Sequence, residues 1–134
     1  MTAATATEPP DGPLIVIRCG AVILFARLNI SQSARDVAAA LPFVSEAGRF
    51  GDEIFFEIPV KSRLAEDARE TVQAGDIAYW PPGRAFCIFW GPTPASVGAE
   101  IRAASRVNVI GRVTGDPAIL SVIREGETVR VEKA

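Results

Sequence analysis

The residues that could carry out chemistry in this sequence are its carboxylates, its basic side chains, one tyrosine and two cysteines, because it contains no histidine. Histidine is the side chain most often used for acid–base catalysis near neutral pH, and it is the commonest metal ligand. Serine or cysteine nucleophiles activated by histidine are therefore excluded. Cys19 and Cys87 form no Cys-x-x-Cys pair, so we predict no zinc or other metal site. No Gly-x-Gly pattern or phosphate loop is present, and we expect no cofactor.

The acidic residues that could form a hydrolytic pair are Asp52 with Glu53, and Asp76. Asp52 follows Gly51 and Asp76 follows Gly75, each at the start of an expected strand. Aspartate is common at such turns because its side chain bonds to nearby backbone amides. We therefore interpret Asp52 and Asp76 as turn residues, and we assign no catalytic residue. Cys19 and Cys87 are expected to be small buried hydrophobic residues, with a disulfide or a reactive thiol as the alternatives.

Residues 75–94 hold both tryptophans and the only tyrosine of the chain. Two apolar runs in this stretch, residues 76–80 and 85–90, are separated by Pro-Pro-Gly-Arg, which predicts a β-hairpin with a type II turn. Both faces of the second run are apolar, although a strand on a small barrel is normally apolar on one face only. Something must cover the outer face. The loop expected at residues 92–105 is the simplest cover, and a homo-oligomer anchored by Trp80 and Trp90 is the next.

Residues 52–60 alternate between two rows of side chains. Successive residues of a strand point to opposite faces, so the wholly apolar row must face the core. The inward row is Ile54, Phe56, Ile58 and Val60, and the outward row includes Glu53, Phe55 and Glu57.

The remaining periodicity predicts about eight short strands and two brief helices. The expected strands are residues 14–19, 22–28, 43–50, 52–60, 76–80, 85–90, 107–113 and 128–132, and the expected helices are residues 34–41, capped by Ser31 or Ser33, and a segment after Asp116 that ends before Gly126. Residues 61–73 are expected to form a surface loop. A closed antiparallel barrel of eight strands with two short capping helices leaves no exposed sheet edge, so we predict this mainly β fold.

At 134 residues the chain fits a single domain, which we assign to residues 14–134. Residues 1–13 are rich in Thr, Ala and Pro and lack the pattern of a signal peptide, which predicts a disordered tail. No apolar stretch approaches the ~20 residues of a membrane helix. The net charge of -2 provides no basic field for nucleic acid or an anionic membrane. We expect a cytoplasmic protein with reduced thiols.

Four motifs follow one another in a fixed order along the chain. They are the helix at residues 34–41 with Pro42 after it, RFGDEIFFEIPV at residues 49–60, GDIAYWPPG at residues 75–83 and VNVIGRV at residues 107–113. Together they resemble a small prokaryotic family of cyclophilin-like proteins. The resemblance covers roughly residues 14–132. It implies a cyclophilin-like eight-stranded barrel with two capping helices, and it implies no established activity.

The comparison with true cyclophilins, which are prolyl isomerases, concerns three positions. Their Phe-His-Arg-Val/Ile-Ile-Pro motif is similar to residues 55–59, so the position of its catalytic arginine is occupied by Glu57. An ionised glutamate cannot donate a proton to the prolyl nitrogen. Their Gln-Phe-Phe-Ile run is similar to residues 85–88, where Ala85 and Cys87 replace the groove glutamine and a groove phenylalanine. The resemblance therefore implies that the usual isomerase residues are absent.

We expect a shallow outer groove that binds a small molecule or a peptide segment. Its expected residues are Phe55, Glu57, Ala85, Cys87 and Phe89, flanked by Arg49 and Arg84. Aromatic walls with one polar group are typical of a ligand site, and Glu57 would accept hydrogen bonds from a cationic or amide-bearing ligand. A solvated strand face without function is the alternative for these residues. An altered prolyl isomerase and a structural subunit of a larger complex are the alternative functions.

Overall fold

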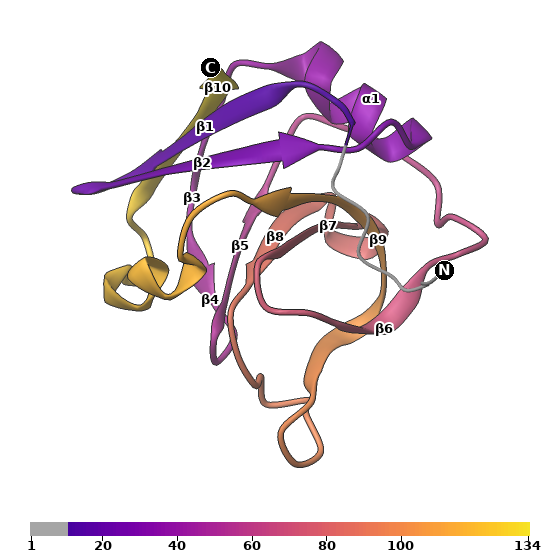
Figure 1. Cartoon of the computed structure of the whole chain (residues 1–134), viewed down its shortest axis with the longest axis vertical. Helices are drawn as coiled ribbons and strands as arrows, with labels where there is room; N and C mark the ends of the chain where they lie inside the picture. Colours follow the sequence, from indigo (N-terminus) through magenta and orange to yellow (C-terminus); the bar gives the residue numbers. More distant parts are fainter. Residues whose placement is uncertain (1–10) are drawn as a thin grey trace.

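The computed structural model describes residues 11–134, so the first ten residues of the predicted tail lie outside the described part. The fold is mainly β and is built around one ten-stranded sheet (Figure 1). The strands are β1 (Leu14–Cys19), β2 (Val22–Leu28), β3 (Phe43–Glu46), β4 (Gly48–Arg49), β5 (Glu53–Glu57), β6 (Arg69–Val72), β7 (Asp76–Trp80), β8 (Ala85–Phe89), β9 (Ile101–Val113) and β10 (Thr128–Lys133). The helical elements are α1 (Gln32–Ala40), η2 (Pro81–Gly83) and η3 (Pro117–Val122).

The expected strands at residues 14–19 and 22–28 form as β1 and β2, which pair as an antiparallel hairpin. Gly20 takes a positive φ of 58° in the turn, a conformation that costs glycine little. Every second residue of β2 is buried, and these residues are Val22, Leu24, Ala26 and Leu28. The pairing extends before β1, where the Gly12 N–H donates to the Leu28 carbonyl at 2.7 Å.

Two helical elements lie where the sequence predicts them. Ser31 caps α1, since its hydroxyl accepts a hydrogen bond from the Ala34 N–H at 3.4 Å. The second element, η3, is a 3-10 helix whose cap is Asp116, which accepts a hydrogen bond from the Ala118 N–H at 3.0 Å. In Figure 1, α1 covers the upper end of the rolled sheet beside β2, and η3 lies on the opposite side from α1.

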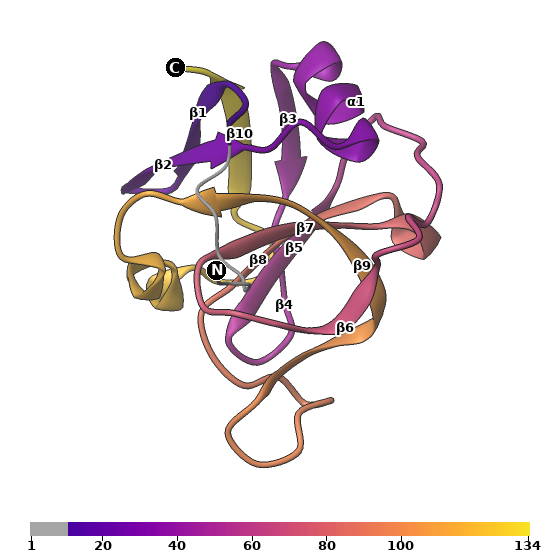
Figure 2. The same ribbon diagram turned by 45° about the vertical axis from the view of Figure 1, so that its right-hand side comes forward.

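The predicted closed barrel of eight strands is not confirmed, because ten strands form and hydrogen bonds do not close the sheet. The strand order is β3-β10-β1-β2-β9-β7-β8-β5-β4, with β6 paired to β9. The two end strands, β3 and β4, follow each other directly in the chain and are separated only by Ala47. One extended segment therefore pairs with β10 at its start and with β5 at its end. The sheet is rolled, and its two ends are joined through the chain rather than through a ladder (Figure 2).

Three local predictions were wrong. Residues 69–72, expected in a loop, form β6 and pair with the first half of β9. That half of β9 starts at Ile101, inside the expected loop at residues 92–105. The hairpin turn is not type II, because η2 fills it and the positive φ, 47°, falls on Arg84. The first two predictions failed because these strands pair with residues distant in sequence, which leaves no local pattern. The third failed on conformation, since the Arg84 N–H donates to the Pro81 carbonyl at 3.1 Å across the predicted four residues but the positive φ is on Arg84.

The outer face of β8 is covered by the same chain. The interior cluster packs Phe56 against Phe86, with ring centroids 5.0 Å apart. A second buried cluster lies outside the sheet and consists of Val72, Ala78, Ala85, Cys87, Phe89, Ala103 and Val107. The first half of β9 and β6 therefore provide the cover that the two apolar faces of β8 require. A second copy of the chain is not needed for this purpose, and association through Trp80 and Trp90 stays a prediction.

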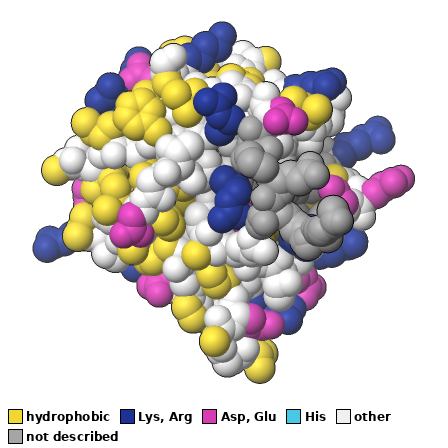
Figure 3. Space-filling model, in the orientation of Figure 1, with side chains coloured by type: hydrophobic (Ala, Val, Ile, Leu, Met, Phe, Trp, Pro, Cys, Tyr) yellow, Lys and Arg dark blue, Asp and Glu magenta, His cyan; other side chains and the backbone are white. Residues whose placement is uncertain are grey.

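Charged side chains of both signs are interspersed on the face shown in Figure 3. Within residues 11–134, no helix has the length and apolar character needed to cross a membrane.

Candidate functional site

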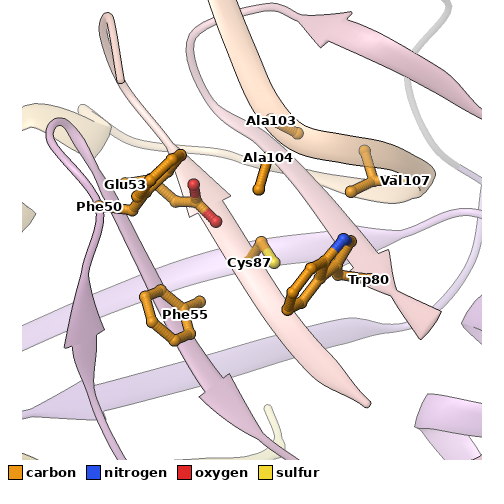
Figure 4. Close-up of a pocket in the computed structure, with 8 residues that line it drawn as sticks. All are labelled: Phe50, Glu53, Phe55, Trp80, Cys87, Ala103, Ala104 and Val107. Atoms are coloured by element: carbon orange, nitrogen blue, oxygen red, sulfur yellow. The ribbon is translucent and has the colours of Figure 1, made fainter. Parts of the chain in front are cut away.

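The main candidate site is a cavity of about 190 Å³ between the outer face of the sheet and the first half of β9. Its floor comes from β5 and β8, and β9 crosses above them (Figure 4). The lining residues are Phe50, Glu53, Phe55, Trp80, Cys87, Ala103, Ala104 and Val107. Seven of these eight side chains are apolar or a thiol, so the cavity is an apolar space with one carboxyl group.

Strand geometry explains how these residues meet. Glu53 and Phe55 are on the same face of β5, since side chains alternate along a strand. Phe55 pairs directly with Cys87 of β8, which brings the ring and the thiol side by side. Trp80 closes one end, and its indole N–H donates to the Ser105 hydroxyl at 2.6 Å. The small side chains of β9, above all Ala103, leave the volume between this strand and the sheet unfilled.

Glu53 is the only acidic residue in the cavity lining, and its side chain is 5% exposed. Its carboxyl group has no ion-pair partner within residues 11–134. Burial raises the pKa of Glu53 to about 7, while a hydrogen bond from the Cys87 thiol acts in the opposite direction. Near neutral pH the group therefore exists in both protonation states. In Figure 4 its carboxyl oxygens point into the space bounded by Cys87, Phe55 and Trp80.

The two cysteines are free and buried, as expected for small hydrophobic residues. Burial raises the pKa of the Cys87 thiol well above its usual range, and the negative charge and hydrogen bonding of Glu53 raise it further. The pKa of Cys19 rises to about 11, chiefly through burial. Both residues therefore remain thiols near neutral pH. Because the thiolate is the nucleophilic form, the raised pKa makes Cys87 a weak nucleophile near neutral pH.

The structure brings only some of the predicted site residues together. Phe55 and Cys87 line the cavity, and Ala85 and Phe89 are buried in the outer cluster beneath it. Glu57 is exposed and does not line the cavity. The polar group of the cavity is therefore Glu53 and not Glu57.

The two predicted flanking arginines are not part of the lining either. Arg49 directs its guanidinium to the carbonyls of Gly51, Ser121 and Ile123, with distances of 2.8 to 3.1 Å. The same guanidinium lies 5.1 Å from the ring centroid of Trp90. Arg84 occupies the hairpin turn with a positive φ. Neither arginine therefore places a donor in the lining of this cavity.

Asp76 has a structural role, as expected for a turn residue. Its carboxylate accepts a hydrogen bond from the Gln73 N–H at 2.9 Å and pairs with Arg112 at 2.7 Å. Burial raises the pKa of Asp76, and the Gln73 N–H and Arg112 oppose this shift. Glu53 is the one acidic residue of the cavity lining, so it has no acid partner there. No group of three His, Cys, Asp or Glu side chains within residues 11–134 is placed to hold a metal ion.

Sequence reasoning did not identify Glu53, Phe50 or the β9 residues as part of the site. The signal for Glu53 was present, because it precedes Phe55 by two residues on the outward row of the strand. The signal for Ala103 and Ala104 was absent, because their segment reads as a loop rich in small residues, and Val107 was expected only as the first residue of a strand.

The chain was compared with known proteins. The sequence model of a family described as cyclophilin-like matches residues 14–132. The solution structure of a hypothetical protein from Archaeoglobus fulgidus is similar, with a TM-score of 0.79 and 38% sequence identity, over 96% of this chain and 100% of that one. A search of curated proteins gave no match.

Proposed function

Because the chain belongs to the cyclophilin-like family and this membership assigns no activity, we propose its function from the cavity. We propose that the protein is a cytoplasmic, non-catalytic module that binds a small molecule. The observation that carries this proposal is the apolar cavity with a single carboxyl group, Glu53, directed into it. Apolar walls with few polar groups are the usual composition of a ligand site. The protonated thiol of Cys87 and the absence of histidine argue against catalysis in the same space.

The size of the cavity favours a small molecule over a peptide segment. At about 190 Å³ it is smaller than the pockets of roughly 300–1,000 Å³ that take drug-sized ligands. An engineered cavity of about 150 Å³ in another protein binds benzene. The space beside Glu53 therefore fits a benzene-sized group with a short polar extension. A peptide would enter only through one of its side chains.

A fragment screen by NMR tests the proposal. We expect small aromatic fragments to shift the amide signals of Phe55, Cys87 and Ala103, which surround the cavity. The substitution Ala103→Leu places a larger side chain at the buried wall and should abolish these shifts. The matched control is Ala99→Leu, at an exposed position outside the cavity, which should preserve them. Thermal unfolding of both variants establishes that they fold. Fragments that bind elsewhere, or equally well to the Ala103→Leu variant, would contradict the proposal.

An altered prolyl isomerase is the second candidate, and the protonation of Glu53 favours it. A neutral carboxyl group donates a hydrogen bond, which is the role of the missing arginine in the isomerases. An apolar site also favours the twisted prolyl bond of the transition state. A protease-free isomerisation assay over peptides with different residues before proline tests this candidate. No acceleration above the uncatalysed rate for any peptide would remove it.

A further inference from the structure

The carboxyl group of Glu53 lacks the partner that a buried carboxylate needs. An ionised carboxylate taken out of water is strongly destabilised unless a cation or several hydrogen bonds compensate for the lost solvent. The only polar neighbour in the cavity lining is the Cys87 thiol, which is a weak donor. On neighbouring elements, Arg102 of β9 pairs with Glu70 and Glu100. The residues that line the cavity therefore supply no positive charge to pair with Glu53.

Three aromatic side chains surround the rest of the cavity, and they are Phe50, Phe55 and Trp80. Aromatic faces attract cations, and tryptophan does so most strongly. The indole N–H of Trp80 is already used by Ser105, at 2.6 Å. Trp80 therefore presents its carbon surface to the cavity. Figure 4 shows Phe55 and Trp80 on either side of Cys87, with Glu53 above them.

The side chains that line the cavity offer too few oxygen ligands for a metal ion. Calcium takes about six to eight oxygen ligands, and magnesium keeps several waters in an octahedral shell. The cavity offers one carboxylate among apolar side chains, so neither ion would be compensated for the loss of its water. A cation with its own hydrocarbon surface matches both parts of the lining. Building on the proposed function, we infer that the cavity selects a small organic ammonium ion, whose N–H groups pair with Glu53 while its hydrocarbon part lies against Phe50, Phe55 and Trp80.

The protonation of Glu53 makes the affinity depend on pH. In the empty cavity burial raises its pKa to about 7, so the group is mostly neutral at pH 6 and mostly ionised at pH 8. The pairing requires the ionised form, and the affinity for an ammonium ion should rise about tenfold over this interval. Cys87 is the only other titratable residue in the lining, and burial keeps it protonated. The guanidinium of Arg49 is bound to backbone carbonyls.

The test compares benzylamine with benzyl alcohol, which has the same ring and a neutral polar group. NMR titrations at pH 6 and pH 8 give both affinities. We expect benzylamine to bind more tightly than benzyl alcohol at pH 8, and its affinity to fall about tenfold at pH 6. The substitution Glu53→Gln should weaken benzylamine at least tenfold and remove the pH dependence, while benzyl alcohol still binds. The matched control is Glu57→Gln, on the exposed end of the same strand, which should change neither affinity.

The outcomes separate this inference from the proposed function. Benzyl alcohol binding as tightly as benzylamine at pH 8, or a Glu53→Gln variant that binds benzylamine unchanged, would overturn the inference and leave a small-molecule site in place. Failure of both compounds and of the fragment screen would overturn the proposed function as well. If Glu53→Gln fails to fold, the affinities of the unsubstituted protein for benzylamine at pH 6 and pH 8 still test the inference, and equal affinities would overturn it.

Discussion

Glu53 and Glu57 lie on the same face of β5 and have opposite environments. Glu53 is 5% exposed beneath β9, whereas Glu57 is exposed at the far end of the strand. Both residues pair with β8, Glu53 opposite Phe89 and Glu57 opposite Ala85. Strand pairing therefore does not explain their different burial, which comes from the cover over β5. The residue at the position of the isomerase arginine is consequently outside the cavity. The carboxyl group that lines the cavity belongs to Glu53, nearer the start of the strand.

Asp76 provides a prediction about a single side chain. Replacing it by alanine removes the acceptor for the Gln73 N–H and the carboxylate partner of Arg112, which keeps only its hydrogen bonds to the Ala74 carbonyl and the Gln73 side chain. We expect the Asp76→Ala substitution to lower the free energy of unfolding by about 2–3 kcal/mol, as measured by urea denaturation. Asp76→Asn is the matched control, because its amide oxygen still accepts from Gln73. If the alanine and asparagine variants were equally stable, the hydrogen bond to Gln73 would have no such role.

At the scale of elements, alternation of apolar side chains was a sufficient signal for most strands. In β2 and β5 every second residue is apolar and buried, although the other row also contains apolar residues, such as Phe25 and Phe55. The signal failed for β6 and for the first half of β9. Their buried positions include only Val72, Ala103 and Val107, too few and too small to show a period. These two strands form because they pair with each other across a long sequence separation, which a local pattern does not contain.

The site was predictable only where it lies on an alternating strand. Phe55 and Cys87 were identified from the faces of β5 and β8, and both line the cavity. Glu53 was on the predicted outward row but was not included in the expected groove. The remaining wall of the cavity is formed by β9, and the packing of β9 against the sheet is a tertiary contact that no local pattern predicts. Sequence reasoning therefore located the floor of the cavity and missed the strand above it.

The approach of β4 to β5 provides a second prediction. A Cβ atom on Gly48 would lie 2.6 Å from the Phe55 ring, so Gly48→Ala must displace this ring. Because Phe55 forms part of the cavity wall, we expect aromatic fragments to bind this variant several-fold more weakly. NMR titration measures the affinity. The matched control is Gly115→Ala, where the new Cβ would lie 3.7 Å from the nearest atom, on Leu24. Unchanged affinity in the Gly48→Ala variant would show that Phe55 does not shape the site.

At the scale of the whole molecule, the rolled sheet separates two apolar clusters. The inner cluster includes Phe56 and Phe86 and fills the space enclosed by the sheet. The outer cluster includes Phe89 and Cys87 and exists because β9 folds back over the sheet. The cavity with Glu53 belongs to the outer cluster. A buried carboxyl group without a partner there lowers the stability of the entire fold whenever it is ionised.

The pH dependence of global stability follows from this burial. The pKa of Glu53 rises from 4.5 to about 7 on folding, so the folded state binds the proton more tightly than the unfolded state does. The free energy of unfolding should therefore fall as the pH rises from 4.5 to about 7, and the contribution of this group is constant above that range. The expected loss is about 3 kcal/mol.

Other carboxylates also titrate in this range, so the comparison with a variant isolates the effect. Relative to the unsubstituted protein, Glu53→Gln should gain stability progressively between pH 4.5 and 7, as measured by denaturant unfolding at several pH values. Glu57→Gln, at an exposed position, should follow the unsubstituted protein. A Glu53→Gln curve parallel to that of the unsubstituted protein would mean that the carboxyl group is hydrated.

An NMR titration of the side-chain carboxyl carbon of Glu53 tests whether this carboxyl group is buried in the cavity without a cation. The expected midpoint is near pH 7, with a shift to lower pH when benzylamine is added at saturation. A midpoint near 4.5, the usual value for glutamate, would contradict the burial of the group and with it the site proposed for this protein.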